Sequence, residues 1–245
     1  MEGKSGIYDI RELRRLFRRR YGRRNKLYLQ GLMERIHFLL IVIGDLHDAV
    51  RKKYFSCYPM AFARVVSGIF GVADHFDMDA LPLEQMMVRK YPEKCAYCGS
   101  APCLCTERRG EAVLAPSVVN AQTNWTLKEW SEHLSKLYGE RNAQSGIDNV
   151  IARLLKEAVE ILSLQIAASH THMPSDELEN EFALELSDVL AWTLGAANLL
   201  QVDLEKAIRE RYEIACPDCR EPDCTCTKFD MRPMDWALVK TERVA

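Results

Sequence analysis

Residues 153–161 read Arg-Leu-Leu-Lys-Glu-Ala-Val-Glu-Ile, and residues 185–190 read Glu-Leu-Ser-Asp-Val-Leu. In both stretches apolar residues recur three and four positions apart, which is the period of an amphipathic helix. Each stretch also carries two acidic side chains three positions apart, so that both face the same side of their helix. These stretches therefore predict a helical fold in which two helices direct four carboxylates toward one region.

The four acidic residues are Glu157, Glu160, Glu185 and Asp188, and each lies among apolar residues. A carboxylate buried without a counter-charge destabilises the fold, and a hard cation can neutralise it. Mg²⁺ binds oxygen ligands octahedrally and is usually shared with the phosphates of a substrate. We therefore predict a magnesium site. The alternative is that all four are ordinary surface acids, because a chain with 35 acidic residues contains such pairs by chance.

The chain also contains an internal repeat. Residues 21–25 read Tyr-Gly-Arg-Arg-Asn, and residues 138–142 read Tyr-Gly-Glu-Arg-Asn. Leu39-Leu40 matches Leu154-Leu155, and Phe62-Ala63 matches Phe182-Ala183. Self-similarity at a steady offset is the signature of duplicated structural units, so we expect two related halves.

The first half keeps only one of the four acidic residues of the second half. The alignment pairs Glu157 with Val42, Glu160 with Asp45, Glu185 with Val65 and Asp188 with Gly68. Acids on a solvated surface more often change to other polar residues than to valine. The valines therefore indicate buried positions and predict that the first half has lost a metal site.

Eight of the nine cysteines form two clusters with the spacing C-x2-C-x4-C-x-C. The first cysteine cluster is Cys95, Cys98, Cys103 and Cys105, and the second is Cys216, Cys219, Cys224 and Cys226. Four thiolates form a closed tetrahedral structural zinc site, and an iron–sulfur cluster is the alternative because it uses the same ligands. Cys57 is left over and is expected to be buried.

Helical periodicity extends over almost the whole sequence. Asp9 with Glu12, and Thr126 with Glu129, have the spacing of a capping box at a helix start. Further helices are predicted over residues 147–168, 175–200 and 204–212, the last of them capped by Asp203. We expect an all-α fold of tandem four-helix-bundle units that form a pseudo-dimer, each followed by a small four-cysteine zinc knuckle. The expected divisions are residues 9–106, a linker at 107–124, and residues 125–228.

The composition of the 245-residue chain is that of an ordinary globular protein, with 48% hydrophobic and 28% charged residues. The formal net charge of −2 excludes a strongly basic nucleic-acid binder, although residues 11–26 form a dense arginine run. No secretory signal is visible at the start of the sequence. Residues 36–43 and 189–200, read as the longest apolar runs, are shorter than the roughly 18 residues of a membrane span. We expect a cytoplasmic protein with no membrane partner.

The stretches quoted first, followed by Val-Asp-Leu-Glu-Lys-Ala-Ile at residues 202–208, resemble the MazG-type all-α nucleoside triphosphate pyrophosphohydrolases. The family motif is E-E-x-x-E, a variable gap, and E-x-x-D; here the gap is residues 161–184. The resemblance covers about residues 126–212. A weaker, degenerate form of the same pattern covers about residues 9–92. It implies that the four acids bind Mg²⁺ and that the C-terminal half hydrolyses a nucleoside triphosphate to the monophosphate and pyrophosphate. Lys156 replaces the first glutamate of the motif.

Five residues are candidates for substrate binding. They are Lys156, Trp192, Asn198, Arg209 and Arg211. Lys156 could contact a phosphate, Trp192 lies one helical turn beyond Asp188, and the resemblance implies basic residues at the end of the last helix. The competing function is a zinc-containing nucleotide-binding or nucleic-acid-binding regulator without turnover. The nucleotide base and sugar, the glutamate that acts as general base, and further association into a homodimer stay open.

Overall fold

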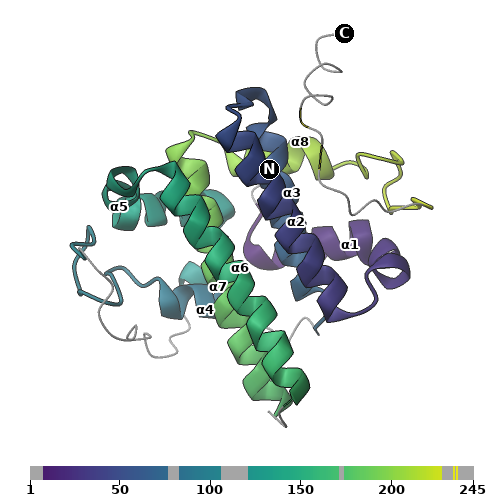
Figure 1. Cartoon of the computed structure of the whole chain (residues 1–245), viewed down its shortest axis with the longest axis horizontal. Coiled ribbons are helices and arrows are strands. Elements are labelled where there is room, and N and C mark those ends of the chain that lie inside the picture. Colours follow the sequence, from purple (N-terminus) through teal and green to yellow (C-terminus); the bar gives the residue numbers. More distant parts are fainter. Residues whose placement is uncertain are drawn as a thin grey trace, which may run out of the picture.

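A computed structural model describes residues 8–76, 83–105, 121–170 and 174–227, together with Met234 and Trp236. This part of the chain is helical, as predicted, and contains no strand apart from an isolated bridge between Asp9 and Thr126. The helices, shown in Figure 1, are α1 Ile10–Tyr28, α2 Leu32–Arg51, η1 Phe55–Cys57, α3 Tyr58–Ala73, α4 Leu83–Lys90, η2 Ala121–Asn124, α5 Leu127–Ser145, α6 Ile147–His170, α7 Ser175–Leu199 and α8 Leu204–Tyr212.

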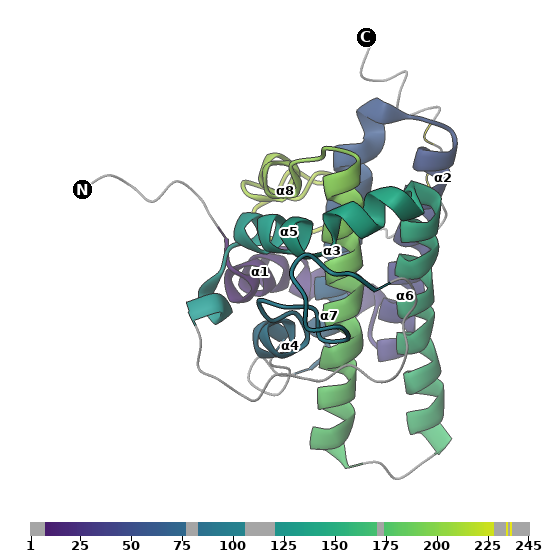
Figure 2. The ribbon, with the colours of Figure 1, turned by 90° about the vertical axis from the view of Figure 1, so that its left-hand side faces the viewer.

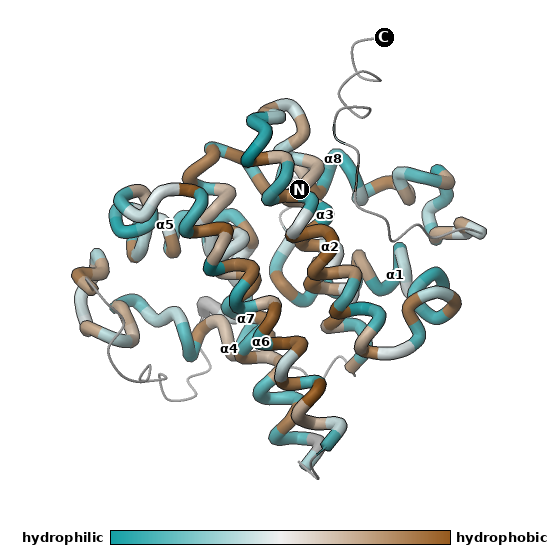
Figure 3. Tube along the Cα trace, viewed as in Figure 1, coloured by the Kyte–Doolittle hydropathy of each residue, from teal (hydrophilic) through white to brown (hydrophobic). Residues whose placement is uncertain are grey.

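Four long helices form the centre of the molecule. Helix α2 packs on α3, α6 packs on α7, and the two pairs meet through contacts of α2 with α6 and of α3 with α7. The repeat residues Leu39, Phe62, Leu154 and Phe182 are fully buried there. Figure 3 shows hydrophobic residues along α2, the central helix of the first half. Burial of these apolar faces is the main term that stabilises the fold.

The starts of several helices follow the capping predictions. The side chain of Asp9 accepts a hydrogen bond from the backbone N–H of Glu12, and Thr126 accepts one from Glu129. The glutamate in each pair accepts a hydrogen bond from the backbone of its cap residue, so both capping boxes are complete. Asp203 caps α8 through the N–H of Lys206, as expected.

The fourth helix of each half packs on the opposite half. Helix α4 contacts α7, and α8 contacts α3. The first helix of each half remains with its own half, since α1 contacts α3 and α5 contacts α7. The two halves are therefore interlocked: each contributes a helix to the packing of the other.

The cysteine clusters follow their helices across to the opposite half. The backbone N–H of Cys103 donates to the carbonyl of Leu137 in α5 at 2.8 Å, and Cys224 donates to Arg20 in α1 at 2.9 Å. Figure 1 shows the two loops at opposite ends of the molecule, the first beside α5 and the second beside α1. Each cluster thus continues directly from the last helix of its half, as expected, but it rests on the first helix of the other half.

Residues Phe55–Ala73, which comprise η1 and α3, are long and apolar enough to cross a membrane by length and composition. Pro59 and Arg64 interrupt its apolar runs, so it does not stand out in the sequence as a continuous apolar segment. Of its most apolar 18-residue segment, 78% is buried inside the protein. It is packed against α1, α2, α7 and α8, as expected for a core helix of a globular fold. The predicted linker lies mostly outside the described residues, apart from η2.

Candidate functional site

Three of the four predicted acids meet between α6 and α7. Carboxylate oxygens of Glu157, Glu160 and Glu185 lie within 4.8 Å of one another, and we call these residues the acid cluster. Figure 2 shows α6 and α7 side by side, which is the arrangement that brings the two acidic faces together. Opposite ligands of an octahedral Mg²⁺ are about 4 Å apart. The three carboxylates are therefore close enough to share one such ion after small adjustments.

Asp188 lies beside the acid cluster and is held by the N-terminal half. The ammonium group of Lys90 lies 2.5 Å from Oδ2 of Asp188, and the hydroxyl of Tyr91 donates to Oδ1. Lys90 also donates to the backbone carbonyl of Leu184, 3.4 Å away. The end of α4 thus supplies a positive charge and a hydroxyl next to the acids of the C-terminal half.

The environment of the acid cluster disfavours the state in which all three carboxyl groups are ionised. Burial raises the pKa of Glu157 to about 8, with smaller contributions from its hydrogen bond to Glu160 and from the charge of Asp188. Burial likewise raises the pKa of Glu185 to about 6. The hydrogen bond from Glu157, together with Lys156, lowers the pKa of Glu160. One proton shared between Glu157 and Glu160 is therefore the preferred state without a cation.

The acid cluster also has a carboxylate oxygen that lacks a donor. Oε2 of Glu185 is buried, and no hydrogen-bond partner reaches it among the described residues. A buried acceptor without a donor costs about 1–3 kcal/mol. A divalent cation at the acid cluster would satisfy this oxygen and favour the charged forms of its neighbours, so the residues present fit Mg²⁺.

A cavity of about 30 Å³ adjoins Asp188, which is space for about two water molecules. Residues of both halves line it: Lys90, Tyr91, Tyr97, Leu134, Tyr138, Arg141, Asn142, Asp188, Ala191, Trp192 and Gly195. The guanidinium of Arg141 lies 4.6 Å from the ring centre of Tyr138 and 5.7 Å from that of Trp192. Trp192, predicted to contact substrate, is therefore a wall of the cavity next to the acids.

The other predicted substrate-binding residues are placed differently. Lys156 lies at the acid cluster, where its ammonium group is paired with Glu160. Asn198 ties α7 to α5, because its side-chain oxygen accepts from the hydroxyl of Ser131 at 2.5 Å and its amide donates to the Ser131 carbonyl at 2.9 Å. Its polar atoms are therefore used in helix packing.

Arg209 and Arg211 lie on α8, which packs on α3 and α5 and not on the acid-bearing faces of α6 and α7. Arg209 pairs with Glu213 at 3.3 Å, and Arg211 donates to the hydroxyl of Tyr212. The structure does not bring either arginine together with the acid cluster.

Lys90, the basic residue paired with Asp188, comes from the other half of the repeat. Lys90 precedes Tyr91 by one position and Cys95 by five, just as Arg211 precedes Tyr212 and Cys216. The repeat therefore contained the signal that identifies Lys90 as the counterpart of Arg211. The sequence does not show, however, that this last helix packs on the opposite half.

In the first half, the positions of the acids are filled and neutralised. Val42 and Val65 are fully buried, and a side chain at Gly68 would come within 3.1 Å of Val42. Asp45, the remaining acid, is paired with Arg64 at 2.8 Å. The carboxylate of Asp45 also accepts a hydrogen bond from the backbone N–H of Met234, and the backbone carbonyl of Asp45 accepts one from the indole of Trp236. Apart from its cysteines, the described part of this half holds no group of three potential metal ligands.

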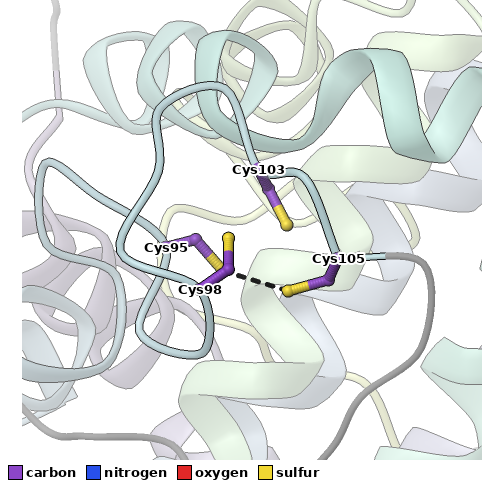
Figure 4. Close-up of side chains that lie close together, drawn as sticks. All are labelled: Cys95, Cys98, Cys103 and Cys105. Atoms are coloured by element: carbon purple, nitrogen blue, oxygen red, sulfur yellow. Dashed lines mark hydrogen bonds between the residues drawn. The ribbon is translucent and has the colours of Figure 1, made fainter.

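Both cysteine clusters have the geometry to bind zinc. In each, the four sulfur atoms lie within 4.8 Å of one another, and Figure 4 shows those of the first cluster converging from one loop. The sulfurs of Cys95 and Cys105 are 3.8 Å apart, close to the ~3.8 Å between thiolates on one tetrahedral zinc. Backbone N–H groups of Leu104 and Ser100 lower the pKa of Cys98 to about 6, which favours the ligating thiolate.

Comparisons of the chain with protein-family models, with curated proteins and with solved structures found no match. The functional inference therefore depends on the geometry of the site and on the sequence pattern.

Proposed function

We propose that the chain is a magnesium-dependent nucleoside triphosphate pyrophosphohydrolase, built from tandem MazG-like four-helix units and active in its C-terminal half. The observation that carries the proposal is the convergence of Glu157, Glu160 and Glu185 within 4.8 Å, between two helices. The buried oxygen of Glu185 without a donor and the raised pKa values of two of these acids support a cation at this place. Asp188 completes the ligand set beside them.

The carboxylates of the acid cluster and Asp188 would hold Mg²⁺. When bound, Mg²⁺ neutralises the triphosphate and lowers the pKa of a coordinated water. In the reaction, a water oxygen forms a bond to the α-phosphorus, and the bond from that phosphorus to the bridging oxygen breaks. Pyrophosphate leaves, and a glutamate of the acid cluster accepts the proton of the water. The products are a nucleoside monophosphate and pyrophosphate.

Residues beside the acid cluster would position the substrate. The ammonium group of Lys90 lies where it can turn from Asp188 to a phosphate oxygen, and Lys156 can do the same from Glu160. The aromatic wall that includes Trp192 offers a flat apolar surface for a nucleobase. Because the cavity is small, the base would enter only if side chains of this wall move aside.

Pyrophosphate release from a panel of canonical and modified nucleoside triphosphates, with Mg²⁺, tests this function. We expect turnover by the wild-type chain and a loss of at least about 10²-fold in Glu157→Gln and in Glu185→Gln, since each removes a ligand charge. Asp148→Asn is the matched control, because Asp148 is an exposed acid in the first turn of α6. It should keep wild-type turnover.

The competing function, nucleotide or nucleic-acid binding without turnover, rests on the exposed arginines of α1, which include Arg15, Arg19 and Arg23. The same assay separates the two. No turnover of any triphosphate, with Glu157→Ala and Glu185→Ala leaving nucleotide affinity unchanged, would eliminate the enzyme proposal.

We also propose that each cysteine cluster binds one structural zinc ion. Elemental analysis should then find two zinc ions per chain. Less than one metal ion per chain would contradict the assignment. Iron in place of zinc, with a visible charge-transfer absorbance, would instead identify iron–sulfur clusters.

A further inference from the structure

We propose that the metal bound by the first cysteine cluster sets the geometry of the catalytic site, whereas the metal of the second cluster supports only the fold. The proposal deepens the proposed function and rests on it for its kinetic consequences. It assigns a positioning role to a metal centre that belongs to the half without the acids.

The chain runs directly from Asp188's partners to the first cysteine cluster. Helix α4 ends at Lys90, the residue paired with Asp188. Tyr91 follows and donates to the same carboxylate, and Cys95 comes four residues later. No helix or strand lies between Tyr91 and Cys105. The position of residues 91–105 therefore depends on their contacts with the rest of the protein and on a metal ion that holds the four cysteines together.

The first cysteine cluster also contacts α5, the helix that carries Arg141. Cys103 donates its N–H to Leu137, and its sulfur lies 3.8 Å from a guanidinium nitrogen of Arg141. Arg141 in turn lies over the rings of Tyr138 and Trp192. The first cysteine cluster is thus in contact with the arginine that packs on the cavity wall.

The loop of the first cysteine cluster also forms part of the cavity wall. Tyr97 lies between Cys95 and Cys98 and lines the cavity together with Asp188. Small four-cysteine sites depend on their metal for their fold. Loss of the ion would therefore release Tyr97 from the cavity wall and loosen the hold of the neighbouring Lys90 and Tyr91 on Asp188.

The second cysteine cluster has the same type of contact in a different setting. Cys224 donates to Arg20 in α1, and the preceding Tyr212 packs edge-on against Phe17 and Tyr21. At the corresponding place in the first half, the acids are replaced by Val42 and Val65. The second cluster therefore lies beside packed aromatic side chains and not beside a carboxylate site. Loss of its metal can serve as an internal control for loss of the first.

Cys98→Ser and its repeat counterpart Cys219→Ser form the matched pair of variants. Each should reduce the zinc content by one ion per chain in elemental analysis. In pyrophosphate release we expect Cys98→Ser to lower kcat/KM by about tenfold or more, with a raised KM because the cavity wall is released. Cys219→Ser should stay within about twofold of wild type at a temperature where both variants remain folded.

Hydrogen exchange of the backbone amides gives a measurement that does not need turnover. Cys98→Ser should speed exchange in the last turn of α4 and in residues 134–142 of α5. Cys219→Ser should speed exchange in α1 and α8 instead. If the wild-type chain hydrolyses no triphosphate, the proposed function fails, and this pattern still shows whether the first cluster holds the site.

A ligand-restoring variant guards against general misfolding. Cys98→His keeps a zinc ligand, so it should regain the second zinc ion, kcat/KM within about threefold of wild type, and slow exchange in α4. Equal kinetic losses in Cys98→Ser and Cys219→Ser, or wild-type kinetics in a Cys98→Ser protein that has lost its zinc, would overturn the proposal. So would exchange that increases equally over the whole chain in both variants.

Discussion

Asp188 and Lys90 form an ion pair between the two halves beside the acid cluster. Both side chains are largely buried, and the oxygen and nitrogen are 2.5 Å apart. Removal of one partner from such a pair leaves an uncompensated charge and costs about 3–5 kcal/mol. The pair therefore couples the packing of α4 on α7 to the charge of the site.

Lys90→Met should lower kcat/KM by about 10²-fold, the size expected when one charged donor leaves a phosphoryl-transfer site. Arg211→Met, at the matching repeat position, should change it little because α8 does not reach the acid cluster. Both are measured by pyrophosphate release, with Tm recorded alongside. A loss in Arg211→Met as large as in Lys90→Met would favour the placement inferred from sequence alone.

The buried acids also predict how stability depends on pH. The folded pKa of Glu157 is raised from 4.5 to about 8, so between these pH values the folded state holds a proton that the unfolded state has released. The metal-free protein should therefore lose stability as pH rises through this window. In chelator at pH 8, Glu157→Gln should be more stable than wild type by several kcal/mol and have a higher Tm, because each unit of pKa shift corresponds to about 1.4 kcal/mol. A Tm equal to or below that of wild type would show that burial of the ionised Glu157 carboxylate does not destabilise the metal-free protein.

The four acids could be found from sequence because i, i+3 spacing is a property of a single helix. Lys90 and Tyr91 could not be found in this way. Their role depends on which helix packs opposite Asp188, and periodicity within α4 carries no information about its neighbour. Only the repeat, which matches Tyr91 with Tyr212, pointed to them.

Among the elements, α5 and α7 are joined by polar contacts as well as by apolar packing. Ser131 and Asn198 exchange two hydrogen bonds across this interface. Because α5 carries Arg141 and α7 carries Asp188, the interface also fixes the width of the cavity.

Asn198→Ala tests whether this residue serves packing or substrate. We expect a loss of about 1–2 kcal/mol in the free energy of unfolding, measured by chemical denaturation, with KM changed less than about threefold at a temperature well below Tm. A large rise in KM with unchanged stability would instead support the substrate-binding role predicted from sequence.

Helix boundaries followed closely from local signals. Asp203 and the two capping boxes mark helix starts because a side chain must satisfy the first free N–H groups, and α8 spans the predicted residues 204–212. The crossing of α4 and α8 to the opposite half was not predictable. An amphipathic helix shows which face it buries, but the same face would fit either α3 or α7.

At the scale of the whole molecule, neither half is complete without the other. The C-terminal half carries every acid of the site, but Lys90, Tyr91 and Tyr97 come from the N-terminal half. The apolar faces of α3 and α7 are each covered by a helix of the opposite half, so separation would expose them to water.

A fragment of residues 121–245 should therefore be inactive in pyrophosphate release and poorly folded by circular dichroism, although it contains the predicted catalytic acids. Co-expression with residues 1–106 should restore a complex with activity. Full activity in the isolated C-terminal fragment would contradict the contribution of the N-terminal half.

The contact of Asp45 with Met234 and Trp236 has a consequence for the order of events during synthesis. A ribosome delivers the N-terminal half first, and domains made early commonly fold before the rest of the chain emerges. Here Asp45 awaits hydrogen-bond donors that lie 189 and 191 residues downstream, and α3 awaits α8. The first half is thus translated early, but its packing is completed only when α8, Met234 and Trp236 have been synthesised. Until then its uncovered apolar surface would make the nascent chain a client for chaperones.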